Sequence, residues 1–94
     1  MPNRAATIRL CLLALDVLDE AYAQARSGPI ERTALHRLAL GNLLLAGVAT
    51  PVHVRRIWAI LGHEGTFEQL SAREAHFGTA MQGIRDRVRG LAGK

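Results

Sequence analysis

Apolar residues recur along this chain at the three- and four-residue spacing of α-helices, and proline or glycine marks most breaks between the apolar segments. No segment alternates apolar and polar residues as a half-buried strand would. The pattern predicts helices from about Arg4 to Arg26, over Pro29–Ala46, over Pro51–Leu61 and from Ala72 to about Leu91, and it allows a short extra turn over Thr66–Leu70. We therefore expect an all-α fold, a compact bundle of four main helices in one domain covering residues 1–94.

The first predicted helix is apolar on nearly every side between Leu10 and Leu15. A helix of this kind is central in its bundle or is shared with a second chain. Three acidic residues, Asp16, Asp19 and Glu20, gather on one face of its C-terminal half. A solvated acidic face is the simpler interpretation of this group, and cation binding is the alternative.

The second predicted helix has two apolar faces. The larger one is formed by Leu35, Leu38, Ala39, Leu45 and Ala46, with Asn42 near its centre. Leu40 and Leu44 lie on the opposite side, so we expect that side to contact a second subunit or a protein partner. Asn42 either sets the register of an association or satisfies a backbone group where Gly41 loosens the helix.

The third predicted helix has one apolar face and one basic face. Thr50 is expected to cap it and Pro51 to occupy its first position. The inward stripe is predicted at Val54, Ile57, Trp58 and Leu61, at helical spacing. The residues predicted to face away are Val52, Arg55, Arg56 and Ala59.

Over Ala39–Leu61, the second helix, the turn and the third helix resemble a helix-turn-helix motif, whose second helix lies in the major groove of DNA. The resemblance implies that Gly47 adopts the left-handed turn conformation and that Val48 packs into the core. It implies DNA contacts from Thr50, Val52, His53, Arg55, Arg56 and Ala59. The inward stripe falls one residue later than in the motif, and Leu43 replaces a small residue. An ordinary helical hairpin with a solvated basic face accounts for the same pattern.

The chain carries a formal net charge of +4, and all its basic residues except Lys94 are arginines. The excess lies mainly in residues 48–94, where we expect any anionic partner to bind. A GC-rich genome also favours arginine codons, so composition alone does not require such a partner. Arg85 and Arg89 share a face of the fourth helix. They could hold a phosphate backbone beside the third helix, or simply complement the helix dipole.

No pattern in the sequence points to catalysis. The four histidines lack metal-ligand spacing, there is no glycine-rich phosphate loop, and the lone Cys11 lies in an apolar run typical of a core residue. We expect a protein with no enzymatic activity, no cofactor and no metal. The apolar run Leu10–Leu15 is shorter than a secretory core, and residues 38–54 contain Gly, Asn and Pro, so we expect no membrane association and a cytoplasmic location.

Two functional hypotheses follow. The favoured one is a small DNA-binding regulator that reads DNA through residues 51–61, as a homodimer because the chain has more apolar surface than one small domain readily hides. The alternative is a protein-binding module acting through Leu40 and Leu44, such as an inhibitor, adaptor or anti-activator of the kind that phages and plasmids carry.

Overall fold

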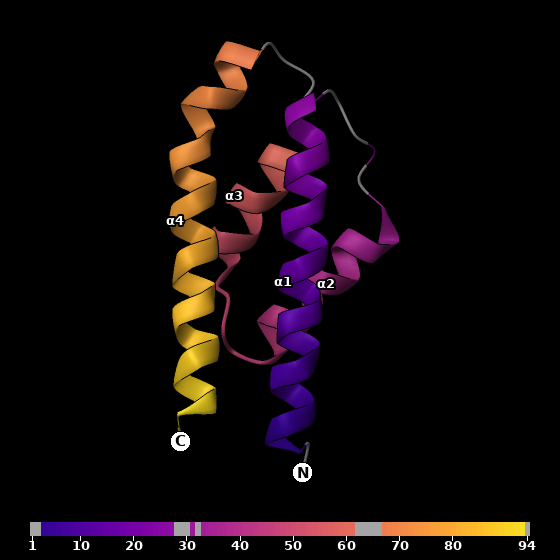
Figure 1. Cartoon of the computed structure of the whole chain (residues 1–94), viewed down its shortest axis with the longest axis vertical. Helices are drawn as coiled ribbons and strands as arrows, with labels where there is room; N and C mark the ends of the chain where they lie inside the picture. The colour runs from indigo at the N-terminus through magenta and orange to yellow at the C-terminus, as the bar shows by residue number, and fades with distance from the viewer. Residues whose placement is uncertain (1–2, 28–30, 32, 62–66, 94) are drawn as a thin grey trace.

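The computed structural model describes residues 3–27, 31, 33–61 and 67–93 of the chain (Figure 1), and the side chains of 26, 27 and 67–76 are not among the features described. Four α-helices lie within these ranges: α1 (Arg4–Ser27), α2 (Ala34–Leu45), α3 (Pro51–Leu61) and α4 (Phe67–Ala92). The expected all-α fold with four main helices is confirmed.

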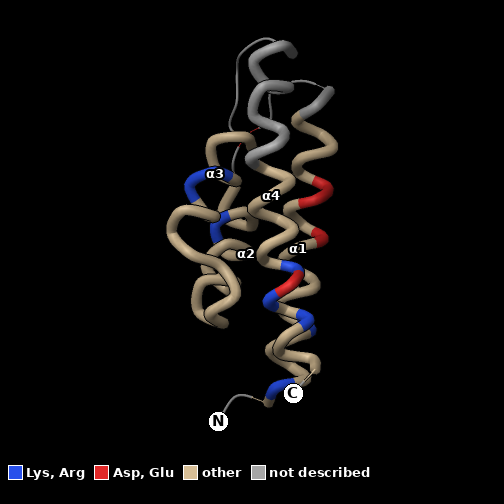
Figure 2. The backbone as a smooth tube through the Cα atoms, turned by 90° about the vertical axis from the view of Figure 1, so that its left-hand side faces the viewer, with Lys and Arg blue, Asp and Glu red and all other residues tan. Residues whose placement is uncertain are grey.

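The two long helices, α1 and α4, run antiparallel side by side, so the two ends of the chain lie at the same end of the molecule (Figure 1). The shorter α2 and α3 form a second layer (Figure 2). α1 contacts all three other helices, and α3 also packs against α4. The first helix is therefore the central one, as its apolar sequence predicts.

Every helix contributes to one hydrophobic core. Leu18 of α1, Leu43 of α2, Ile57 of α3 and Ile84 of α4 are all completely buried. Between α1 and α4, the ring of Phe77 belongs to this core and the ring of Tyr22 stacks on it, with the two centroids 4.2 Å apart. Aliphatic side chains therefore form most of the core, as expected for a chain with few aromatic residues.

Two predicted helix starts were wrong. α2 begins at Ala34 instead of Pro29, because Thr33 is extended (φ −106°, ψ 171°) and caps the helix through its hydroxyl oxygen; Pro29 itself lies outside the described residues. α4 begins at Phe67 instead of Ala72, and its first turn takes up most of the segment expected to form a separate turn. Residues 68–70 are strong helix formers, so the helix continues through Ser71 without using it as a cap.

The turn between α2 and α3 has the geometry that the sequence implies. Gly47 has a positive φ of 75°, and its N–H donates to the carbonyl oxygen of Leu44 at 3.0 Å. The N–H of Val48 donates to the carbonyl oxygen of Leu43 at 3.1 Å, which completes a Schellman motif. Val48 is 2 % exposed and belongs to the same core cluster as Leu43. Both expectations for Gly47 and Val48 are confirmed.

The Schellman motif also sets which face of α2 is buried, and here the sequence prediction was wrong. The helix buries His36, Ala39, Leu40 and Leu43, whereas Leu35, Leu38 and Leu45 of the predicted inward face are exposed. Val48 and Leu43 occupy the two positions of a Schellman motif whose side chains pack together. Burying Val48 therefore rotates Leu43, and Leu40 with it, into the core.

Candidate nucleic-acid interface

The N-terminus of α3 is closed by a reciprocal pair of hydrogen bonds between Thr50 and His53. The N–H of His53 donates to Thr50 Oγ1 at 3.3 Å, and the N–H of Thr50 donates to His53 Nδ1 at 3.1 Å. This arrangement is a capping box in which histidine takes the place of the usual Glu or Gln. The expected cap at Thr50 is confirmed. Because Nδ1 accepts a hydrogen bond, the imidazole is neutral and carries its proton on Nε2.

The capping box turns His53 toward α4, away from the outer face on which the sequence placed it. Its Nδ1 lies 3.2 Å from Nη1 of Arg87, and its ring passes beside Gly83. Burial, and then the positive charges of Arg87 and Arg56, lower the pKa of His53. A DNA-contacting role for His53 would therefore have to compete with contacts inside the protein.

The other predicted contact residues of α3 do face outward. Val52, Arg55, Arg56 and Ala59 are all exposed, as expected. The opposite side of the helix packs into the molecule through Ile57, Ile60 and Leu61, with Val54 and Trp58 half-buried beside them. Ile60 was missed in the sequence prediction, although it follows Ile57 by three residues, which is helical spacing. α3 is thus anchored on one side and free on the other.

Arg85 and Arg89 of α4 contact carboxylates, whereas the arginines of α3 do not within the described residues. Nη2 of Arg85 lies 2.6 Å from both carboxylate oxygens of Asp19, and Arg89 lies 3.6 Å from Asp86 (Nη1 to Oδ1). The structure brings Arg85 to the acidic group of α1, a contact that no pattern in the sequence predicts. Arg55 and Arg56, by contrast, have no carboxylate within ion-pair distance in the part of the chain that the structure describes.

The side chains of α2 and α3 that carry a full charge are all arginines. Neither α2 nor α3 contains an acidic residue. Figure 2 places the arginines of α3 on one side of the molecule and the acidic residues of α1 on the other. Arg87 adds a further cation next to His53, at the border of α3 and α4. We call Arg55, Arg56 and Arg87 the basic edge; a surface of this charge attracts polyanions.

An apolar groove of about 430 Å³ separates α2 from α3. It is lined by Arg37, Leu40, Gly41, Leu44, Val54 and Trp58, and the Arg37 guanidinium lies over the Trp58 ring, 5.6 Å from its centroid. Leu40 lies at its floor and is only 3 % exposed, so the expectation that it would be free for a protein partner was wrong. Leu44 is partly exposed at the groove, consistent with its predicted position.

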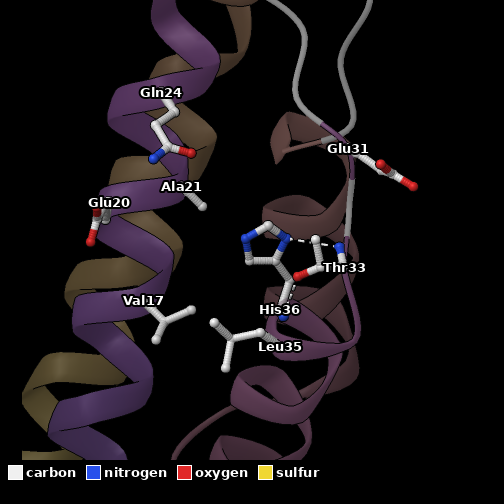
Figure 3. A pocket seen from close by; sticks show the side chains of 8 residues that line it. All are labelled: Val17, Glu20, Ala21, Gln24, Glu31, Thr33, Leu35 and His36. Atoms are coloured by element: carbon white, nitrogen blue, oxygen red, sulfur yellow. Dashed lines mark hydrogen bonds between the residues drawn. The ribbon is translucent and has the colours of Figure 1, made fainter.

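A second hollow, of about 540 Å³, lies between α1 and α2 (Figure 3). His36 points from α2 toward α1 here, and its Nδ1 accepts the N–H of Thr33 at 3.1 Å in a capping box like that of Thr50 and His53. The sequence repeats Thr-x-x-His at residues 33–36 and 50–53, and in each repeat the threonine immediately precedes the first residue of a helix. That repeat was the signal that could have located both helix starts.

The described residues contain no cluster of three or more histidine, cysteine or carboxylate side chains that could hold a metal ion. Cys11 is buried in the core, and burial raises the pKa of its thiol. Among the helices as described, none has both the length and the apolar character that crossing a membrane requires.

The chain matches no protein-family model, no curated protein and no solved structure with which we compared it.

Proposed function

We propose that this protein is a small, non-enzymatic DNA-binding regulator that contacts duplex DNA through the exposed face of α3. The observation that supports it best is the exposure of two arginines of α3 that have no carboxylate partner among the described residues. Arg55 and Arg56 project from a helix whose other side is buried, and the described part of the chain offers them no carboxylate. Exposed guanidinium groups of this kind bind phosphates and guanine bases through paired hydrogen bonds.

We propose different roles for the residues around this face of α3. Val52 and Ala59 share the exposed face and would lie against bases or sugars, while Thr50 and His53 hold the start of the helix. Arg87 would add a phosphate contact at the border with α4. Arg85 and Arg89 would contribute less, because each would have to exchange a carboxylate partner for a phosphate.

The turn between α2 and α3 is longer than the turn of the common helix-turn-helix. Residues 46–50 separate α2 from α3, one or two more than the turn of roughly three to four residues that is usual in the motif. The two helices are also separated by the apolar groove. We therefore propose α3 as the reading helix, without requiring that α2 cross the DNA backbone as it does in that motif.

The test is a fluorescence-anisotropy titration with random duplex DNA at about 50 and 200 mM salt. Affinity should fall steeply between the two salt concentrations. The double variant Arg55→Ala, Arg56→Ala should lose most of the affinity. The slope of the logarithm of its binding constant against the logarithm of the salt concentration should be shallower by about 2, roughly one for each phosphate contact removed. Its far-ultraviolet circular dichroism should be unchanged, because both side chains are exposed.

The matched control is the double variant Arg4→Ala, Arg89→Ala, which removes the same charge from the far ends of α1 and α4. It should keep nearly all the affinity. If both double variants lose affinity equally, binding follows net charge and α3 is not the reading helix. If the wild-type protein does not bind at the lower salt concentration, the DNA-binding proposal is wrong.

The α2–α3 groove favours a second candidate, a protein-binding module. Its apolar lining and the partly exposed Leu44 suit an apolar side chain of a partner, although Leu40 contributes only its buried floor. This function predicts that Leu44→Asp loses the partner in a pull-down, whereas the Arg55→Ala, Arg56→Ala variant retains it. The opposite pattern would exclude the groove as the partner's binding site.

A further inference from the structure

One side of α1 is left uncovered by the other three helices (Figures 1 and 2), although at its margins Leu12 and Asp16 line a hollow shared with α4 and Glu20 lines the hollow shared with α2. Its residues, which we call the outer stripe, are Arg9, Leu12, Leu13, Asp16 and Glu20, and all five are exposed. Leu12 and Leu13 expose 50 % and 55 % of their surface at the centre of the stripe. The spacing of the stripe is three and four residues, which is the spacing of helices that pair along their length.

The charges of the outer stripe have a definite order along the helix. Arg9 precedes the two leucines, and Asp16 and Glu20 follow them. In the described part of the chain none of these three charged residues has an ion-pair partner, although the neighbouring Asp19 is held by Arg85. Arg9 and Asp16 lie equally far from the midpoint between Leu12 and Leu13, so the stripe is complementary to an antiparallel copy of itself.

We propose that two copies of this chain associate through the outer stripe as a two-fold dimer with their α1 helices antiparallel. Leu12 of each copy would pack against Leu13 of the other. Arg9 of each copy would pair with Asp16 of the other, with Glu20 beyond it. Such an isologous contact forms every favourable pair twice. A parallel arrangement would instead place like charges opposite each other, which disfavours it.

The order of charges favours a second copy over an unrelated partner. A foreign surface would need its own acid, apolar centre and base at matching spacing, whereas a second α1 supplies them by symmetry. Leu10, also half exposed, borders the stripe and would widen the apolar contact. The two α3 helices lie in the other layer of each copy, so the dimer would leave both basic edges accessible (Figure 2).

The experiment is sedimentation equilibrium of the full chain over a concentration series. The wild-type protein should have the mass of two chains. Arg9→Glu and Asp16→Arg should each weaken the dimer by at least about tenfold, because each places like charges opposite each other twice. An equimolar mixture of these two variants should recover the mass of two chains, since each then offers the charge that the other lacks.

The matched control is Arg55→Glu, which makes the same change of charge as Arg9→Glu on the opposite layer; it should leave the dimer intact. Circular dichroism separates loss of association from loss of folding. If Arg9→Glu does not fold, Asp16→Arg alone tests whether charge reversal weakens the dimer. A wild-type chain that stays monomeric at protein concentrations up to about 1 mM would overturn the proposal, because only very weak association escapes detection at that concentration. So would a dimer that both single variants leave unchanged, or a mixture of folded variants that stays monomeric. None of these results depends on whether α3 binds DNA.

Discussion

Arg87 of α4 lies 3.2 Å from Nδ1 of His53 of α3, and the same nitrogen accepts the backbone N–H of Thr50. One neutral imidazole thus caps the helix that carries the exposed arginines and also joins that helix to α4. A proton on Nδ1 would remove the acceptor and place a positive charge beside Arg87 and Arg56.

Replacing Thr50 should loosen the start of α3. Thr50→Ala removes the hydroxyl that accepts the N–H of His53 and should lower the free energy of unfolding by about 1 kcal/mol. Thr50→Ser keeps the hydroxyl and should cost much less. Urea denaturation of the three proteins measures the difference. Equal stability of the alanine and serine variants would mean that the hydroxyl does not stabilise the helix.

The stability of the protein should depend on the ionisation of His53. Its pKa lies below the ordinary value of about 6.5, because of burial and then of Arg87 and Arg56. Above about pH 6.5 His53 is neutral in both the folded and the unfolded chain, and its contribution is fully present. As the pH falls below that value the unfolded chain takes up the proton first, so the free energy of unfolding decreases until the pH passes the folded pKa.

His53→Gln is the control for this pH dependence, because glutamine can keep the capping box and does not titrate. The difference in unfolding free energy between the wild-type protein and His53→Gln should change in favour of the variant as the pH falls from about 7 toward 5. Thermal or urea denaturation at a series of pH values gives this difference. A difference that stays constant with pH would show that His53 has the same pKa in both states.

Among the glycines that the structure describes, Gly47 should be the least tolerant of substitution. Its φ of 75° strains any side chain, although no atom lies within 4 Å of where a Cβ would be. Gly47→Ala should therefore destabilise the protein by about 1–2 kcal/mol. Gly78 is exposed within α4 and also has open space around it, so Gly78→Ala should stabilise by about 0.5–1 kcal/mol. Effects of the same sign at both positions would contradict this account of the turn.

Two leucines of α2 test which face of the helix is buried. Leu43 is completely buried, and Leu43→Ala should cost about 2–5 kcal/mol. Leu45 is 88 % exposed, and Leu45→Ala should change stability by less than about 0.5 kcal/mol. Both variants lose the same atoms within one turn of the helix, but from opposite sides of it. A large effect at Leu45 with a small one at Leu43 would support the face predicted from the sequence.

The ion pair between Arg85 and Asp19 joins the two long helices, yet it should contribute little to stability. The side chains retain 35 % and 46 % of their exposure, so water and salt screen the pair. A double-mutant cycle with Arg85→Ala and Asp19→Ala should give a coupling energy of about 0.2–1 kcal/mol that decreases with salt. A coupling well above that range would mean that the pair is less solvated than its exposure indicates.

The features that depend on neighbouring residues could be predicted from the amino-acid sequence. The start of α3 follows from Thr50 and Pro51, because capping and a fixed proline φ act within one turn of helix. The left-handed conformation of Gly47 and the burial of Val48 follow in the same way from the chemistry of a helix end. The exposed positions of Arg55 and Arg56 follow from the single apolar stripe of α3.

The features that depend on contacts between distant segments became visible only in the folded chain. α2 is apolar on two sides, so its periodicity could not distinguish Leu40, which is buried, from Leu38, which is exposed. Asp19 and Arg85 lie in separate charged groups of the sequence, and the packing of α1 against α4 brings them together. That contact engages Arg85 and leaves Arg55 and Arg56 as the better candidates for binding DNA. Local patterns set each helix and its ends, whereas the rotation of a helix and the partners of its charges are set by the elements that pack against it.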